Sequence, residues 1–497
     1  MDCESENAKW FSPGRFALFL AALIAICFPG ILTGTESFVL RDYTLFGYPL
    51  AHFHRECFWM GEWALWNPYN QCGMPFLAQW NTLCLYPLSL VYLLFPVVWG
   101  LGLFCVLHLW IGGFGMYWLA RDRTVCGFAG CVAGILYAFN GLVQTSLMWP
   151  NNIAAFGWLP WVLLLFDRAV KTGGRWMFMA GLAGGVQMLT GAPEIILVTW
   201  AIAGFRALAT VRPTWKPVRR GAVVAGLTSG LAAVQLFPFL DLLARSGRAS
   251  GAGGGGWAMA VDGWCHLFVP LYKTVLAPAG FRAQVDQFWT LSYYTGIGGL
   301  VLAVMAWRCV DCRREVALWW LIGLGALGLA IGQGGLLYPL LGKILPLELM
   351  RYPVKFVIAL SVAVPMIAAF GVGAMTRRGR VSGAHGLSEY CVIGSCVAWV
   401  AWKIRGWDEF GVLRRDWMDS AMFSISVMAL LFLASNARRA FPLRVWGTAF
   451  LLICFADLRH HSVPLTPTIA AGLLEPPQQG PDSAGLGGGR TAVTRGV

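Results

Sequence analysis

The sequence predicts an all-α polytopic membrane protein with about 13 transmembrane helices and a large first outer loop containing interfacial helices. Of the 497 residues, 58% are hydrophobic and only 12% are charged, and the mean hydropathy is +0.63. A typical soluble domain is about 25% charged. Apolar stretches long enough to cross a hydrocarbon core of about 30 Å recur along the whole chain. Such stretches cross membranes as helices because helices satisfy their own backbone hydrogen bonds.

The net charge of +13 does not indicate nucleic-acid binding. The Lys and Arg residues lie mainly in short segments between apolar runs, where they orient a membrane protein. The sequence contains no soluble basic domain and no zinc-finger spacing. We therefore expect a lipid bilayer, and no nucleic acid, among the partners.

The first apolar run, roughly 16–32, follows a polar stretch that carries Lys9 and Arg15. This arrangement resembles a signal sequence, but no clear small-x-small cleavage site follows it. We therefore predict a retained first helix with its N-terminus in the cytoplasm, in a multi-pass protein of the inner (cytoplasmic) membrane.

Residues 83–98 are apolar but short, and they contain Pro87 and Pro96. If this segment and the next run, 99–119, both cross the membrane, Arg121 and Arg123 lie outside. If 83–98 only enters the interface, the two arginines lie in the cytoplasm, which positive charge prefers. The second arrangement is the one we predict.

With 16–32 and 99–119, the predicted spans are 125–147, 153–166, 176–190, 194–210, 221–243, 293–307, 316–332, 354–375, 388–402, 418–435 and 443–457. The short outer turns Pro150–Asn152 and Gly191–Pro193 carry no Lys or Arg, whereas each short inner loop carries at least two. One membrane domain, 1–474, then has outer loops at 35–98, 244–292 and 333–353. Residues 475–497 are rich in Pro, Gly and Ser and are expected to be a disordered outer tail.

Asp42 lies about ten residues after the first helix, at the head of a polar and aromatic stretch. Alone, it would be interpreted as a solvated loop acid. The surrounding Trp, Tyr and Pro residues are typical of a segment at the membrane interface. Because other ionisable residues are predicted on the same face, Asp42 is a candidate catalytic residue.

Glu194 occupies a very short outer turn between two apolar runs. A charge at the bilayer centre costs about 2.5–3.5 kcal/mol, and less near the interface. A functional carboxylate is one interpretation. The other is an acid that favours the N-terminus of the helix after Pro193.

Arg351 and Lys355 stand at the start of a predicted span, four residues apart. On an α-helix this spacing places both side chains on one face. A guanidinium and an ammonium together suit a phosphate group. The alternative is that both are anchors whose charged ends reach the membrane surface.

His52, His54 and Glu56 alternate in the first outer loop. An alternating pair suits a strand better than the amphipathic helix expected here, so we assign no metal ligands. A divalent metal is possible, but the sequence indicates no definite cofactor.

An ordered set of short motifs resembles the YfhO-like family of bacterial membrane proteins. The motifs in the first loop are Asp42-Tyr43, Gly61-Glu62-Trp63-Ala64-Leu65-Trp66-Asn67-Pro68, Gly73-Met74-Pro75-Phe76 and Leu85-Tyr86-Pro87. The later ones are Gly191–Glu194, Ser292–Gly296, Leu337–Leu340, Arg351–Pro353 and Ala456–Leu458. That family is similar to the GT-C class of membrane glycosyltransferases, and the resemblance implies a GT-C-like fold.

The resemblance also implies a reaction in which a sugar moves from a polyprenyl-phosphate carrier to a cell-envelope acceptor. Asp42 corresponds to the family's acidic residue and would be the base, with Arg351 and Lys355 holding phosphate. Tyr43, Trp63, Trp66 and Tyr69 would form an aromatic platform for sugar or isoprenoid. The turn at Glu194 departs from the form seen in many relatives, which leaves the role of Glu194 open.

Two other functions stay open. A transporter or flippase for lipid-linked glycans would place polar residues along several spans, whereas the ionisable residues here are predicted at one face. A non-catalytic scaffold for envelope assembly would retain the fold without turnover.

Overall fold

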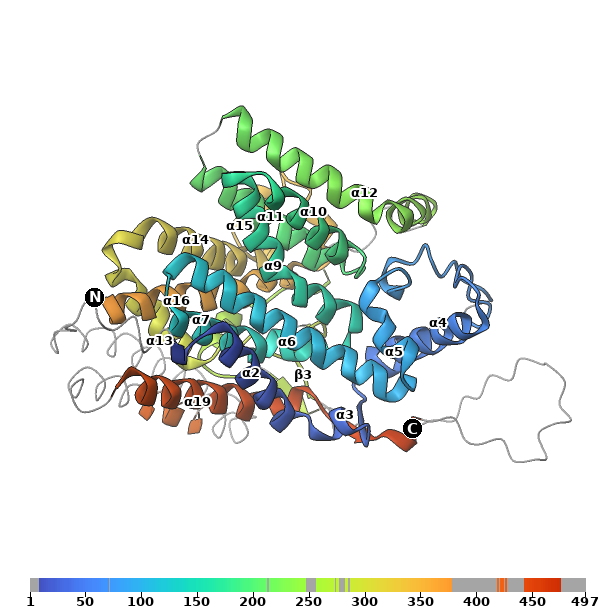
Figure 1. The fold of residues 1–497 in the computed structure, drawn as a ribbon, viewed down its shortest axis with the longest axis horizontal. Coiled ribbons are helices and arrows are strands. Elements are labelled where there is room, and N and C mark those ends of the chain that lie inside the picture. The colour runs from blue at the N-terminus through green and yellow to red at the C-terminus, as the bar shows by residue number, and fades with distance from the viewer. Residues whose placement is uncertain are drawn as a thin grey trace, which may run out of the picture.

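A computed structural model describes residues 9–70, 72–211, 214–246, 256–272, 274–276, 282–284, 287–377, 418–419, 421–423, 425–426 and 442–474. The predicted span 388–402, most of 418–435 and the tail 475–497 lie outside these ranges. The described part is mainly helical, with two small two-stranded sheets (Figure 1).

Within the described residues, five helical segments are long and apolar enough to cross a membrane. They are α6 (Val97–Thr124), α9 (Pro150–Thr172), α11 (Pro193–Thr210), α12 (Trp215–Arg245) and the run Pro353–Met375. The last segment consists of the 3-10 helix η11 (Pro353–Ala359) and most of α16 (Leu360–Arg377). These helices give the protein a multi-pass membrane architecture, while the count of 13 spans stays a prediction.

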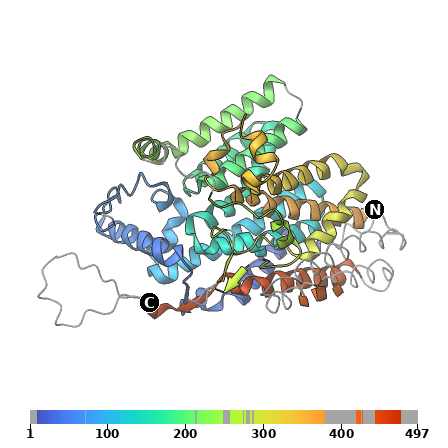
Figure 2. The ribbon, with the colours of Figure 1, turned by 180° about the vertical axis from the view of Figure 1, so that it is seen from behind.

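The other described α-helices do not individually combine this length with this apolar composition. They are α2 (Pro13–Cys27), α3 (Pro29–Thr33), α4 (Tyr48–Met60), α5 (Leu90–Leu94), α7 (Gly127–Phe139), α8 (Gly141–Thr145), α10 (Arg175–Met188), α13 (Ile297–Met305), α14 (Arg313–Ala330), α15 (Leu337–Leu341) and α19 (Leu443–Ser462). Segment 83–98 contains α5 and no long helix. In Figures 1 and 2, α4 projects from the same end of the bundle at which α5 lies.

The predicted continuous span 125–147 is broken in the structure. α7 and the following segment Gly141–Met148 meet at an angle of 41°. Asn140 causes the break, because its backbone is extended and its side chain accepts a hydrogen bond from the Val143 amide at 2.9 Å. A side chain that caps a new helix in this way ends the preceding one.

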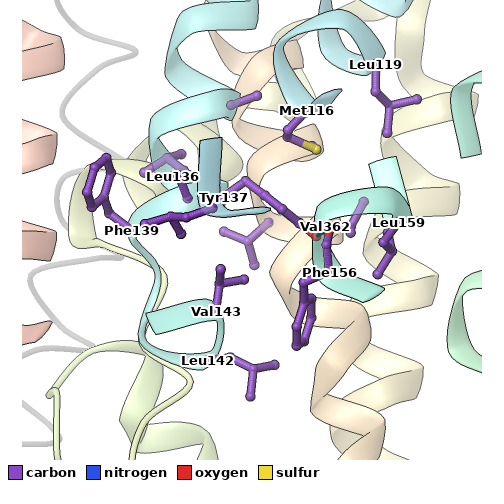
Figure 3. Packing of buried hydrophobic residues seen from close by; sticks show 14 of the residues in the cluster. Met116, Leu119, Leu136, Tyr137, Phe139, Leu142, Val143, Phe156, Leu159 and Val362 are labelled. Atoms are coloured by element: carbon purple, nitrogen blue, oxygen red, sulfur yellow. Dashed lines mark hydrogen bonds between the residues drawn. The ribbon is translucent and has the colours of Figure 1, made fainter. Parts of the chain in front are cut away.

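The hydrophobic core lies where α6, α7, α9 and α16 meet. Figure 3 shows Met116 of α6, Tyr137 of α7, Phe156 of α9 and Val362 of α16 pointing into this region. In the run Pro353–Met375, 94% of the most apolar 18-residue stretch is buried inside the protein, whereas in α12 the corresponding share is 22%. α16 is therefore a central helix, and α12 lies at the edge with an apolar surface suited to lipid.

A network of charged side chains ties together the ends of α6, α9 and α11 and the start of α14. Arg206 is fully buried and reaches Asp167 at 3.3 Å and Glu315 at 3.1 Å. Arg123 also pairs with Asp167. Buried charges are costly unless they are paired, and each of these arginines has an acidic partner. We call this the arginine end of the bundle.

The first and last described segments of the chain meet in a small antiparallel sheet. Strand β1 (Glu36–Phe38) pairs with β4 (Thr468–Ala470), with Ser37 opposite Ile469. Nearby, the buried carboxylate of Asp457 on α19 accepts hydrogen bonds from the Tyr294 hydroxyl at 2.8 Å and the Ile297 amide at 3.0 Å. A second sheet pairs β2 (Thr274–Leu276) with β3 (Arg282–Gln284).

Candidate functional site

A pocket of about 510 Å³ lies at the end of the bundle away from the arginine end, where α9 and α11 begin. Its lining comes from widely separated segments: Arg41, Asp42, Phe46, Gly47, Leu50, Ala51, Asn81, Thr82, Leu83, Tyr92, Leu101, Trp149, Pro150, Asn151, Asn152, Glu194, Trp257, Trp289, Arg351, Tyr352 and Lys355. The structure thus brings together Asp42, Glu194, Arg351 and Lys355, which the sequence singled out.

Asp42 is held by an aromatic neighbour. It lies between β1 and the π-helical turn η1 (Tyr43–Gly47), and its Oδ2 accepts a hydrogen bond from Trp149 Nε1. Trp149 immediately precedes α9 and is fixed by that long helix. Within the described part of the chain, Trp149 is the only side chain that donates to this carboxylate. Oδ1 of Asp42 therefore accepts no side-chain hydrogen bond from the described residues and can accept one from a bound molecule.

Gly47 lets the turn after Asp42 approach α9 closely. A Cβ at Gly47 would lie 3.0 Å from Cγ of Pro150, which is tighter than ordinary van der Waals contact. On the other side, β1 is held by β4. Both flanks of Asp42 are thus anchored, which fixes the position of its carboxylate.

Glu194 and Lys355 form an ion pair inside the pocket. Their side chains are 20% and 9% exposed, respectively. Glu194 stands in the first turn of α11, after a turn in which Gly191 has φ +66°. A Cβ at Gly191 would lie 1.7 Å from the Trp80 carbonyl oxygen, so only glycine fits there.

Arg351 and Lys355 do not share one face of an α-helix, and that expectation was wrong. Lys355 lies in the 3-10 helix η11, while Arg351 precedes it with φ +55°. Tyr352 is extended because it is followed by Pro353, and this conformation prevents the helix from continuing back to Arg351. Both cations nevertheless line the pocket.

Arg41 is a third cation of the pocket, which sequence reasoning missed. Its guanidinium donates to the Phe288 carbonyl and lies 5.8 Å from the Trp149 ring centroid. The backbone of Arg41 has φ +48°, so Arg41 and Arg351 both adopt the left-handed backbone conformation at the pocket. Such strain in residues other than glycine is concentrated at functional sites. The signal available in the sequence was its position next to Asp42.

The aromatic residues expected at the site lie elsewhere. Trp63, Trp66 and Tyr69 are 75%, 57% and 82% exposed and do not line the pocket. Tyr43 is buried, with its ring edge-on to Phe38 at 5.7 Å. The aromatic part of the lining consists instead mainly of four residues that we call the aromatic wall: Trp149, Trp257, Trp289 and Tyr352.

Comparison with known proteins finds only distantly similar solved structures. No protein-family profile and no curated protein sequence matches this chain. Two similar solved structures are those of ArnT from Cupriavidus metallidurans, bound to undecaprenyl phosphate and in the apo state, with 14% and 15% identity. Each has a TM-score of 0.48, and they cover 91% and 90% of this chain and 78% and 77% of their own. A likeness of this degree does not assign an activity.

The alternating residues of the first loop lie on α4. His52 and Glu56 are one turn apart at 3.5 Å, whereas His54 is buried with its Nδ1 3.2 Å from the Tyr92 hydroxyl. Burial lowers the pKa of His54 to about 4. Among the described residues, no group of three or more His, Cys, Asp or Glu side chains is arranged to hold a metal ion.

The pocket combines a half-buried carboxylate with three cationic side chains. Its lining contains two carboxylates, Asp42 and Glu194, and three cations, Arg41, Arg351 and Lys355, which leaves one excess positive charge. The first turns of α9 and α11 also meet the pocket and add the positive ends of two helix dipoles. Such a site can accept a proton on its carboxylate while it holds a group with one negative charge.

Proposed function

We propose that this protein transfers a sugar from a polyprenyl-phosphate-linked donor to a hydroxyl of a cell-envelope acceptor, at the outer face of the cytoplasmic membrane. The observation that carries this proposal is that Asp42, oriented by Trp149, shares one pocket with Arg41, Arg351 and Lys355. A GT-C-type fold, as the YfhO-like motifs suggest, would provide such a pocket at a membrane surface.

Asp42 acts as the general base. In the transfer, the acceptor oxygen bonds to the anomeric carbon as the bond from that carbon to the phosphate oxygen breaks. The acceptor proton passes to the Asp42 carboxylate, and the bonding electron pair leaves with the polyprenyl phosphate. A carboxylate that lines the pocket and is held in position by one hydrogen bond, through Oδ2, suits this proton transfer.

The cations stabilise the phosphate that leaves. A sugar linked to one lipid phosphate carries a single negative charge, which the excess positive charge of the lining matches. Arg351 is the main phosphate ligand, because among the described residues its guanidinium has no hydrogen-bond or ion-pair acceptor, whereas that of Arg41 donates to the Phe288 carbonyl. Arg41 and the start of α9 support it, while Lys355 is already neutralised by Glu194. Preorganised positive charge lowers the barrier for a departing anion.

The test replaces the proposed base in cells that otherwise lack the protein. Asp42→Asn keeps the size of the side chain and can still accept the Trp149 hydrogen bond, but it cannot take the proton. We expect surface-glycan modification to fall at least a hundredfold at normal expression. Asp241→Asn, at an exposed acid of α12 outside the pocket lining, is the matched control. Full activity of Asp42→Asn would refute the general-base role.

A further inference from the structure

The aromatic wall is a row of two ring pairs with Lys355 between them. Trp149 and Trp289 stack at 6.3 Å with an interplanar angle of 15°. Tyr352 and Trp257 lie 4.4 Å apart at 31°. Lys355 joins the two pairs, because its Nζ is 5.8 Å from the Trp289 ring and 5.1 Å from the Tyr352 ring. Four rings from four separate positions in the chain therefore form one surface of the pocket.

The row connects the proposed base to the cations. Trp149, at one end, donates its indole N–H to Asp42. Tyr352, toward the other end, lies 4.8 Å under the guanidinium of Arg351. A group resting on the wall is thus placed between Asp42 and Arg351, the proposed main phosphate ligand, which is where the anomeric carbon must lie during transfer.

The chemistry around the wall suits a sugar ring better than a lipid tail. The faces of a pyranose present C–H groups that pack on aromatic rings, while its hydroxyls require hydrogen-bond partners. Asn151 and Asn152, at the start of α9, line the same pocket and offer amide donors and acceptors. An isoprenoid tail would desolvate these amides and the neighbouring charges without replacing their hydrogen bonds.

We propose that the aromatic wall is the sugar subsite, which binds a pyranose ring by stacking and places its anomeric carbon between Asp42 and Arg351. This assignment rests on the proposed transfer of a lipid-linked sugar. It differs from the aromatic platform predicted from the sequence, since Trp63, Trp66 and Tyr69 lie outside the pocket lining. It adds Trp257 and Tyr352 as residues that determine donor affinity.

The test measures how much the sugar contributes to binding. Purified protein in nanodiscs is titrated with undecaprenyl phosphate and with undecaprenyl phosphate linked to glucose, galactose or mannose. We expect at least one sugar-linked lipid to bind the wild type more tightly than the bare lipid. Trp257→Ala should weaken that binding about tenfold and change bare-lipid binding less than twofold. Trp257→Phe should restore most of the loss, and Trp63→Ala, at an exposed tryptophan, should have no effect.

The outcomes separate this proposal from the proposed function. If Trp257→Ala weakens bare and sugar-linked lipids equally, or weakens neither, the wall is not a sugar subsite. The same conclusion follows if no sugar-linked lipid binds more tightly than the bare lipid, although transfer that depends on Asp42 could still stand. If the wild type binds none of the four lipids, the proposed function itself fails.

Discussion

The indole N–H of Trp149 donates a hydrogen bond to Oδ2 of Asp42, and this contact joins two residues that are 107 positions apart. Trp149 also stacks on Trp289 and lies under Arg41. One side chain therefore links the proposed base, a cation and the aromatic wall.

Removing the indole N–H of Trp149 should impair the proposed base, Asp42, while the pocket still binds lipid phosphate. Trp149→Phe retains an aromatic ring but leaves Oδ2 of Asp42 without its donor. We expect transfer to fall about tenfold, because a net hydrogen bond to a charged group contributes about 1.5–3 kcal/mol. Affinity for undecaprenyl phosphate should change less than twofold. Trp99→Phe, which removes a similar N–H bond to the Leu32 carbonyl, is the control. Equal losses in both variants would refute a specific role for Trp149.

Arg351 and Lys355 should contribute unequally to phosphate binding. Lys355 is paired with Glu194 inside the pocket, whereas Arg351 is exposed at its edge. We expect Arg351→Ala to weaken undecaprenyl phosphate binding about tenfold and Lys355→Ala less than threefold. Arg351→Lys should recover only part of the affinity, because an ammonium lacks the planar fork. Unchanged affinity in both alanine variants would contradict the phosphate clamp.

Breaking the Glu194–Lys355 pair should destabilise the fold at the pocket. Both side chains are largely buried, so either single substitution leaves a charge without its partner. We expect Glu194→Gln or Lys355→Met to lower the unfolding free energy by about 3 kcal/mol, seen as a lower thermal midpoint in detergent. The double variant should be more stable than the sum of the two losses predicts. Strict additivity would show that the pair has no coupling energy.

His54 should make stability depend on pH. Its pKa is about 4 in the folded protein, against 6.5 in the unfolded chain. Between these values the unfolded state binds the additional proton, so stability falls as the pH decreases from 6.5 toward 4 and is unaffected by this group above 6.5. The full effect is about 3 kcal/mol.

Thermal midpoints measured from pH 7.5 to pH 4.5 test this dependence. His54→Gln cannot titrate and should lose less stability than the wild type over that range. His52→Gln, at a partly exposed histidine on the same helix, should follow the wild type. Parallel curves for all three proteins would rule out His54 as the source.

Labelling tests the predicted orientation in the membrane. In a Cys72→Ser background, which removes an exposed cysteine from the same loop, Glu62→Cys should react with an impermeant thiol reagent added to whole cells. Lys171→Cys, at the far end of α9, should react only after permeabilisation. The reverse pattern would place the pocket in the cytoplasm.

The overall class of fold and the convergence of four site residues could be predicted from the sequence. Glu194 follows a very short turn between two helices, and Arg351 lies two residues before another span. The pattern of apolar runs and of loop charges in a sequence predicts where membrane helices end and on which side of the membrane each end lies. This pattern does not specify side-chain partners, so the pairing of Lys355 with Glu194 was not predicted.

The aromatic residues show the limit of composition as a guide. Trp66 and Trp149 are both tryptophans near polar turns, but only Trp149 lines the pocket. The difference is tertiary: Trp149 is fixed at the start of α9 beside Asp42, whereas Trp66 lies on a projecting loop. Arg41 was missed for the same reason, since its role depends on a backbone conformation that its neighbours impose.

The pairing of β1 with β4 sets an order of events during biosynthesis. Asp42 leaves the ribosome early, four residues after β1, but the strand that anchors β1 lies more than four hundred residues later. Contacts so distant in sequence form late, because the intervening chain must first be made and inserted. The nascent protein therefore carries an incomplete pocket through most of its synthesis. The flank of Asp42 that β1 forms would be anchored only when α19 and β4 dock.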